Sequence, residues 1–258
     1  MNTVFFADTD SLRNPELFET AYRLVDFDRQ SKVDRIRFDK DKRLSLGAGF
    51  LLFTALCEYG LKPPFSFEQN EFGKPFLVGN KDVFFSLSHS GTLAMCAVSP
   101  VPIGVDVERK KEADLRIAKR FFHSEEYEAV ISSSDPLRQS EMFFRIWTRK
   151  ESYVKAIGKG LALPFESFNS LNEEIDGFIL NDIETDFLDR GCQMSFSENN
   201  SSKEDVGKSF LSYKAAVCRL SSSPEDQSQN SKEENAPSCL NENYEIRIID
   251  FEQSKLLQ

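Results

Sequence analysis

The chain has 258 residues, 40% of them hydrophobic, and its 24 phenylalanines indicate an ordinary folded interior of one large domain or two small ones. A formal net charge of −10 argues against general binding of nucleic acids or anionic membranes. The five cysteines show no CxxC spacing and only two histidines are present, which argues against a zinc site of the usual kind. No secretory signal begins the chain and no apolar run is long enough to span a bilayer, so we expect a soluble, cytoplasmic protein with reduced thiols.

The predicted elements begin with a helical segment over residues 28–59, in which Gly47, Ala48 and Gly49 permit close packing of helices. A block rich in strands follows over 65–109 and is divided by turn signals such as Ser90–Gly91. Antiparallel strands that follow a long helix predict an α+β fold.

The second helical block covers 112–132, with Ser124 as the expected N-cap. The strongest helical pattern covers 137–160 and stops at Gly158 and Gly160. Later strand candidates lie in 177–180, 209–220 and 244–251. Between the last two, residues 221–243 are polar with few large apolar side chains, which predicts a flexible insertion.

The stretch IGVDVERK, residues 103–110, reads as a short strand with two acids on one side. Side chains alternate faces along a strand, so Asp106 and Glu108 should project together. Two interpretations fit these residues taken alone. The acids either lie on a solvated edge face or hold a divalent cation between them.

The helix over 143–157 places Glu151 at the border of its apolar stripe, with Lys155 four residues later. An exposed ion pair of small energetic value is one interpretation of these two residues. The other interpretation is that these two residues line the wall of a cleft. Lys150 lies near the middle of the apolar stripe, so its amine either extends to solvent or pairs with a buried acid.

Four motifs in order resemble those of the 4′-phosphopantetheinyl transferase superfamily, closest to its larger monomeric members of the type that activates surfactin synthetase. They are Gly73-Lys74-Pro75, Ser88-His89-Ser90, the GVDVE strand, and WTRKESYVK on the helix. The similarity covers roughly residues 28 to 220. Each motif alone is weak, and together they are specific.

The resemblance implies transfer of the phosphopantetheine arm of coenzyme A to a serine of an acyl- or peptidyl-carrier protein, with release of adenosine 3′,5′-bisphosphate. It further implies Mg²⁺, with Mn²⁺ as an alternative, held by Asp106, Glu108 and Glu151. Catalysis would then consist of alignment and charge stabilisation. The resemblance implies catalytic roles for Asp106, Glu151 and Lys155, with Glu151, or a water it orients, as the proton acceptor.

The same resemblance implies a set of residues that bind coenzyme A: Arg43, Lys74, Pro75, Ser88, His89 and Lys155. A histidine that caps the turn before Gly91 remains an alternative for His89, and a solvated helix residue remains one for Arg43. The family's basic cluster for the 3′-phosphate falls near Lys32, Arg35 and Arg37, where the alignment leaves the individual ligands open.

The densest basic stretch of the chain, Arg109–Arg120, directly follows the acidic strand. Carrier proteins are usually acidic and this chain is acidic overall, so docking needs a local complement. We predict that this segment docks the carrier protein, although a solvated helix face would have the same composition.

By resemblance, the fold is α+β with two similar halves, each a long helix packed on a small antiparallel sheet and related by a pseudo-two-fold axis. The expected division is 1–104, 105–220 with the metal acids and catalytic helix, the insertion 221–243, and a final strand and tail at 244–258. Two alternatives have other functions: a metal-dependent phosphohydrolase of coenzyme A, and a non-catalytic homologue that binds carrier protein.

Overall fold

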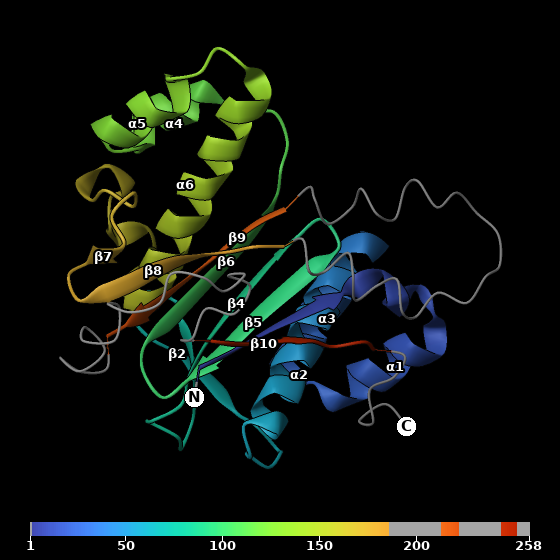
Figure 1. The fold of residues 1–258 in the computed structure, drawn as a ribbon. Helices are drawn as coiled ribbons and strands as arrows, with labels where there is room; N and C mark the ends of the chain where they lie inside the picture. The colour runs from blue at the N-terminus through green and yellow to red at the C-terminus, as the bar shows by residue number, and fades with distance from the viewer. Residues whose placement is uncertain (1, 186–212, 222–243, 252–258) are drawn as a thin grey trace, which may run out of the picture.

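The computed structural model of the chain describes residues 2–185, 213–221 and 244–251. Its two four-stranded sheets lie between two groups of helices (Figure 1). Apart from Ser221, the predicted insertion 221–243 lies outside the described residues. No helix within the described ranges combines the length and the apolar character needed to cross a membrane.

The N-terminal sheet has the order β10-β1-β5-β4. Its strands are β1 (Thr3–Asp8), β4 (Phe84–Ser90), β5 (Leu93–Ser99) and β10 (Glu245–Ile248). Strand β1 pairs antiparallel with β5 and parallel with β10, so the last described strand joins the sheet that holds the first. A separate hairpin is formed by β2 (Phe67–Gln69) and β3 (Pro75–Leu77).

Three helices and a 3-10 helix belong to this half. They are η1 (Thr9–Arg13), α1 (Pro15–Leu24), α2 (Phe27–Arg35) and α3 (Asp39–Glu58). Because β1 is apolar on both faces, Phe5 packs in the cluster beneath α3 while Phe6 packs in a second cluster on the opposite face. The two glycines of α3 allow close packing, as predicted: Gly47 lies against Thr9 and Gly49 against Arg29.

The C-terminal sheet is antiparallel with the order β6-β9-β8-β7. Its strands are β6 (Ile103–Arg109), β7 (Glu174–Ile175), β8 (Phe178–Ile183) and β9 (Tyr213–Leu220). The remaining helices are α4 (Leu115–Phe121), α5 (Ser124–Ile131), α6 (Pro136–Ile157), η2 (Gly160–Ala162) and η3 (Phe165–Ser167). The long helix α6 packs on β6, β9 and β8.

The two sheets share one hydrophobic cluster. Phe6 and Met95 of the N-terminal sheet pack with Val105, Val107 and Val217 of the C-terminal sheet. The halves therefore form one body around a common core, and strands β4 and β6 meet at its seam.

The α+β prediction is confirmed, and each half places a long helix on a four-stranded sheet. The pseudo-two-fold relation and the division at 104/105, a position inside β6, stay predictions. Two local predictions are wrong. The helical segment 28–59 is two helices, because the chain is extended from Ile36 to Phe38, and the N-cap of α5 is His123 rather than Ser124, since the His123 side chain accepts from Glu125 N.

Candidate active site

Strand β6 separates its side chains as the alternation predicted. Val105 and Val107 are buried in the core between the sheets, whereas Gly104, Asp106 and Glu108 face the other way, toward α6. The prediction that the two acids share one face is confirmed.

Gly104 explains how α6 comes so near these acids. A Cβ at this position would lie 2.0 Å from Ser152 O and 2.4 Å from Ala156 N, so only glycine allows the helix backbone to cross the strand here. The crossing places the α6 residues Glu151 and Lys155 beside the acidic face of β6.

Asp106 is 3% exposed, and its two carboxylate oxygens differ. Oδ1 accepts hydrogen bonds from Lys155 Nζ at 2.6 Å and from Ser88 Oγ at 2.7 Å. Oδ2 is buried and has no hydrogen-bond partner among the described residues. An orphaned carboxylate oxygen is costly to bury, which points to a ligand that the protein binds at this atom.

Glu108 and Glu151 lie within electrostatic reach of Asp106. Burial raises the pKa of Glu108, a hydrogen bond from Ser90 Oγ at 2.7 Å opposes the rise, and the charge of Asp106 adds to it. Burial also raises the pKa of Glu151, and the charges of Asp106 and Glu108 contribute, while Lys155 opposes them. Repulsion between neighbouring carboxylates is the electrostatic condition that a bound cation relieves.

The donor set fits a hard cation without forming a complete site by itself. Over residues 2–185, 213–221 and 244–251, no three His, Cys, Asp or Glu side chains are grouped closely enough to hold a metal ion. Mg²⁺ usually takes one or two carboxylates and fills its remaining positions with water and substrate phosphate. The orphaned Asp106 Oδ2 fits such a role. The three-carboxylate ligand set stays a prediction.

A cavity of about 650 Å³ opens on the N-terminal half. Three cations of α2 line it together with the predicted turn residues: Arg29, Lys32, Arg35, Gly73 and Pro75. The lining also holds three acids, Asp26, Asp28 and Glu68, so the cavity is mixed in charge, and its three cations are the groups that could bind phosphate. Of the basic cluster that sequence left open, Lys32 and Arg35 line the cavity, while Arg37 lies over the Phe38 ring at 5.6 Å instead.

His89 lies within electrostatic reach of cations from both halves of the molecule. Partial burial lowers the pKa of His89, and the positive charges of Lys32, Lys155 and Arg29 lower it further. These cations come from both halves of the molecule, so an anion that spans the seam would meet them in succession.

Sequence reasoning missed Arg29. It lies three residues before Lys32, a spacing that places the two on neighbouring positions of one helix face. Its side chain crosses Gly49 of α3 and donates to Ser45 O at 3.4 Å. The helical spacing was the available signal.

Two predicted coenzyme A ligands are engaged elsewhere. Arg43 lies 4.0 Å from Asp10, and the cavity lining does not include it. Lys74 Nζ donates to Ile103 O at 3.2 Å and to Ala156 O at 3.1 Å, so it joins the β2–β3 hairpin to the start of β6 and the end of α6. Phosphate binding by these two side chains stays a prediction. In the structure, each of them makes a contact within the protein instead.

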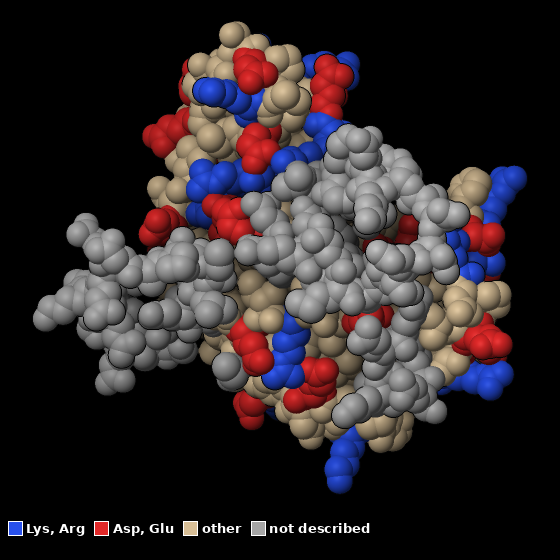
Figure 2. Space-filling view, turned by 45° about the vertical axis from the view of Figure 1, so that its right-hand side comes forward, with Lys and Arg blue, Asp and Glu red and all other residues tan. Residues whose placement is uncertain are grey.

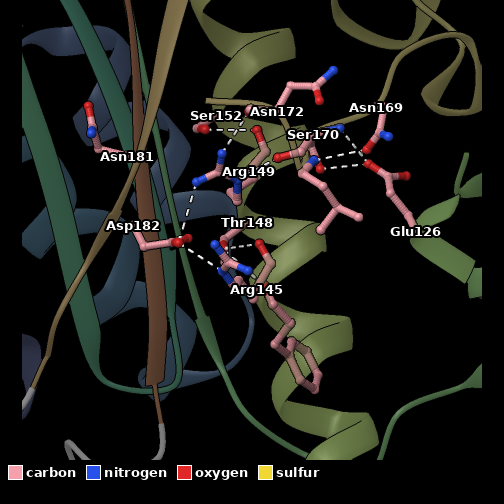
Figure 3. Close-up of polar contacts among 12 residues, drawn as sticks. Glu126, Arg145, Thr148, Arg149, Ser152, Asn169, Ser170, Asn172, Asn181 and Asp182 are labelled. Atoms are coloured by element: carbon pink, nitrogen blue, oxygen red, sulfur yellow. Dashed lines mark hydrogen bonds and ion pairs between the residues drawn. The ribbon is translucent and has the colours of Figure 1, made fainter. Parts of the chain in front are cut away.

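Two buried cations fix the side of α6 that faces away from the acids. Lys150 pairs with Glu126 at 2.8 Å, with both side chains fully buried, which agrees with the predicted buried acid. Arg149 donates to Asn172 O and lies 3.4 Å from Asp182 of β8 (Figure 3). These directional contacts set the rotation of α6 about its axis, and hence where Glu151 points.

The basic segment Arg109–Arg120 runs from the end of β6 into α4. On the lobe that α4, α5 and α6 form, basic and acidic side chains are interspersed (Figure 2). Lys110 pairs with Glu141 at 2.8 Å, and Arg116 pairs with Asp114 at 2.8 Å. Lys119 and Arg120 are exposed at the end of α4.

Comparison with known proteins agrees with the geometry. The sequence profile of the 4′-phosphopantetheinyl transferase superfamily matches residues 102–218. A 4′-phosphopantetheinyl transferase of Bacillus subtilis is 36% identical over 196 residues, which cover 75% of this chain and 81% of that protein. The 4′-phosphopantetheinyl transferase gsp of Aneurinibacillus migulanus is 37% identical over 161 residues, 61% of this chain and 59% of its own. An L-aminoadipate-semialdehyde dehydrogenase-phosphopantetheinyl transferase of Mus musculus is 29% identical over 162 residues, 57% of this chain and 52% of its own.

Proposed function

Because this chain belongs to the 4′-phosphopantetheinyl transferase superfamily, we propose that it transfers the 4′-phosphopantetheine arm of coenzyme A to a serine of a carrier protein. The observation that carries this proposal is the buried Asp106, whose Oδ2 has no partner among the described residues and which has both the cation Lys155 and the acid Glu151 nearby. A diphosphate needs both kinds of neighbour.

In the proposed reaction, the hydroxyl oxygen of the carrier serine forms a bond to the β-phosphorus of coenzyme A. The bond between that phosphorus and the bridging oxygen breaks, and adenosine 3′,5′-bisphosphate leaves. The serine proton passes to Glu151 or to a water that Glu151 orients. Because phosphoryl transfer needs little covalent chemistry from the protein, alignment and charge stabilisation carry the catalysis.

We assign the cations of the N-terminal half to the nucleotide. Lys32 and Arg35, with Arg29 beside them, would bind the 3′-phosphate in the cavity, and Pro75 would line it. His89 and Lys155 would hold the diphosphate between the cavity and the acids. A cation at Lys155 also offsets negative charge on the departing bisphosphate.

Asp106, Glu108 and Glu151 would hold Mg²⁺ or Mn²⁺, with the free Asp106 Oδ2 as one donor. When bound there, the cation neutralises charge on the diphosphate oxygens. Lys155 orients the Asp106 carboxylate through its 2.6 Å contact.

The exposed cations of Arg109–Arg120, above all Lys119 and Arg120, would receive the acidic carrier protein beside the acids. We propose that the protein is a monomer, since the two halves of one chain supply both the cations and the carboxylates. We also propose that it acts in the cytoplasm.

Mass spectrometry tests the proposal. Purified apo carrier proteins of fatty-acid, polyketide and peptide-antibiotic type are mixed with coenzyme A, Mg²⁺ and the enzyme. We expect a mass gain equal to the phosphopantetheine arm, lost in Asp106→Ala and kept in Glu128→Ala, an exposed acid of α5. Release of adenosine bisphosphate without any carrier protein would identify a phosphohydrolase instead. Carrier-protein binding with no reaction would identify a non-catalytic homologue.

A further inference from the structure

Three serines alternate along β4 and face the edge of β6. Each hydroxyl accepts one backbone N–H from β6: Val105 N to Ser86 Oγ at 3.1 Å, Val107 N to Ser88 Oγ at 3.3 Å and Arg109 N to Ser90 Oγ at 3.1 Å. These side chains therefore satisfy edge N–H groups of one sheet from the neighbouring edge of the other.

Two of the three serines also donate to a carboxylate. Ser88 Oγ donates to Asp106 at 2.7 Å, and Ser90 Oγ donates to Glu108 at 2.7 Å. Within the described chain, the corresponding neighbour of Ser86 is Gly104, which has no side chain. The same backbone contact thus occurs three times, and twice it is coupled to a proposed metal ligand.

Counting hydrogen bonds separates two roles for Ser88. A serine hydroxyl has one proton to donate and two lone pairs that accept. The proton of Ser88 goes to Asp106, and its lone pairs receive Val107 N at 3.3 Å and Lys155 Nζ at 3.1 Å. The side chain is saturated, so it has no donor left for a phosphate oxygen of coenzyme A.

We propose that Ser88 and Ser90 are positioning residues that orient Asp106 and Glu108 toward the bound cation, while Ser86 only joins the two sheets. Each hydroxyl is fixed by the β6 backbone one residue after the carboxylate that it holds. One carboxylate oxygen is thereby fixed in direction, and for Asp106 the other is left free. The inference rests on the proposed function for the identity of the cation site.

The test compares Ser86→Ala, Ser88→Ala and Ser90→Ala, with Ser90→Thr as the variant that keeps a hydroxyl. Mg²⁺ is titrated by calorimetry into each full-length protein with saturating coenzyme A. We expect Ser88→Ala and Ser90→Ala to weaken Mg²⁺ binding by about tenfold, as loss of a group that orients a metal ligand usually does. Ser86→Ala and Ser90→Thr should stay within about twofold of wild type. All three alanine variants should lower the melting temperature, because each loses a contact to a β6 N–H, and Ser86→Ala measures the loss of that contact alone.

A double-variant cycle asks whether Ser90 acts through Glu108. If it does, Ser90→Ala should have little further effect on Mg²⁺ affinity or kcat in a Glu108→Gln background, whereas the Ser86→Ala loss of stability should remain additive. Because the Ser90 variants act away from the cavity, KM for coenzyme A should change less than kcat.

Equal weakening of Mg²⁺ binding by Ser86→Ala and Ser90→Ala would overturn the inference, as would unchanged binding in Ser90→Ala or absence of Mg²⁺ binding in the wild type. If Ser88→Ala fails to fold, the Ser90 pair and its cycle decide the question. A wild type that binds Mg²⁺ with the expected pattern but modifies no carrier protein would remove the transferase proposal and leave the positioning role standing. If the wild type modifies a carrier protein but the serine variants do not show the expected Mg²⁺ affinities, the positioning role would be removed and the transferase proposal would stand.

Discussion

The two halves of the molecule are built from similar elements but present different charged side chains. Each half packs a long helix on a four-stranded sheet, α3 in the first and α6 in the second. The first half lines its cavity with the cations of α2, whereas the second presents the carboxylates of β6 and α6. On the proposed function, the first half would supply cations that bind phosphate and the second half the carboxylates, both to one ligand.

The two long helices are also held in different ways. The buried stretch of α3 is small or apolar and is fixed by shape, with Gly47 and Gly49 admitting their neighbours. Helix α6 buries Arg149 and Lys150 and is fixed by directional bonds. A helix that must aim a carboxylate at a fixed point gains from contacts that specify rotation as well as distance.

Removing the buried ion pair of Lys150 should have the largest effect on how α6 is held. Lys150→Met leaves Glu126 as an uncompensated buried charge, so we expect a loss of about 3 to 5 kcal/mol in the free energy of unfolding by urea. Arg116→Ala, which removes an exposed ion pair, is the control and should leave the free energy of unfolding nearly unchanged. Adding Glu126→Gln to Lys150→Met should recover part of the loss, and a single-variant loss as small as that of the control would contradict the anchoring role.

The cationic wall can be tested separately from the acidic one. Lys32→Ala should raise KM for coenzyme A by roughly 10- to 100-fold, the effect of losing a contact to a charged group, and should leave KM for the carrier protein unchanged. Arg37→Ala is the matched control, since Arg37 belongs to the same basic cluster but lies over Phe38. Equal effects of the two variants in steady-state kinetics would sink the assignment of the cavity.

The stability of the contact between the two halves should depend on pH through Lys74. Burial lowers the pKa of Lys74 to about 8, from 10.5 in an exposed lysine. Between these values the unfolded chain holds a proton that the folded chain has lost, so stability contributed by Lys74 rises with pH through this window. The neutral amine keeps two N–H donors, enough for both of its carbonyl partners.

We therefore expect the stability lost in Lys74→Met to be about 1 to 2 kcal/mol larger at the top of this window than at its bottom, measured by urea unfolding. Asn70→Ala removes the other bond between the hairpin and the end of α6, from Asn70 Nδ2 to Gly158 O at 2.9 Å, and titrates nothing. Its loss should not vary with pH. If the stability lost in Lys74→Met becomes smaller as pH rises, the predicted direction of the pH dependence is wrong.

The smallest expected effect lies on the docking surface. Lys119→Glu should raise KM for the carrier protein about two- to fivefold at low salt and leave coenzyme A binding alone, because Lys119 is exposed at the end of α4. Lys119 is a better test than Arg116, because Arg116→Glu would also place a second acid beside Asp114. An equal rise in both KM values would remove the docking role.

Local patterns predicted the parts of the site that depend on one element at a time. Alternation along β6 placed Asp106 and Glu108 on one face, and helical periodicity put Lys150 in the apolar stripe. The break from Ile36 to Phe38 was not predictable, since neither proline nor glycine marks it. After the break, α2 and α3 pack together, with Arg29 against Gly49.

Relations between distant elements lay beyond the sequence. The match of Ser88 and Ser90 to Asp106 and Glu108 depends on how two sheet edges are aligned, which no local pattern encodes. A buried acid was one of two alternatives for Lys150, and identifying it as Glu126 required knowing where α5 packs. Arg43 shows the converse, a residue in a plausible motif whose helix turns it toward Asp10.

The parallel pairing of β10 with β1 has a consequence for how the chain is made. Strand β1 is synthesised first, yet its outer hydrogen-bonding edge is covered only when Glu245–Ile248 arrives. A nascent chain that has emerged through residue 104 therefore carries a sheet with one open side, exposed to any other extended segment nearby. The first half cannot be completed on the ribosome before the second, and the molecule closes only when its two ends meet.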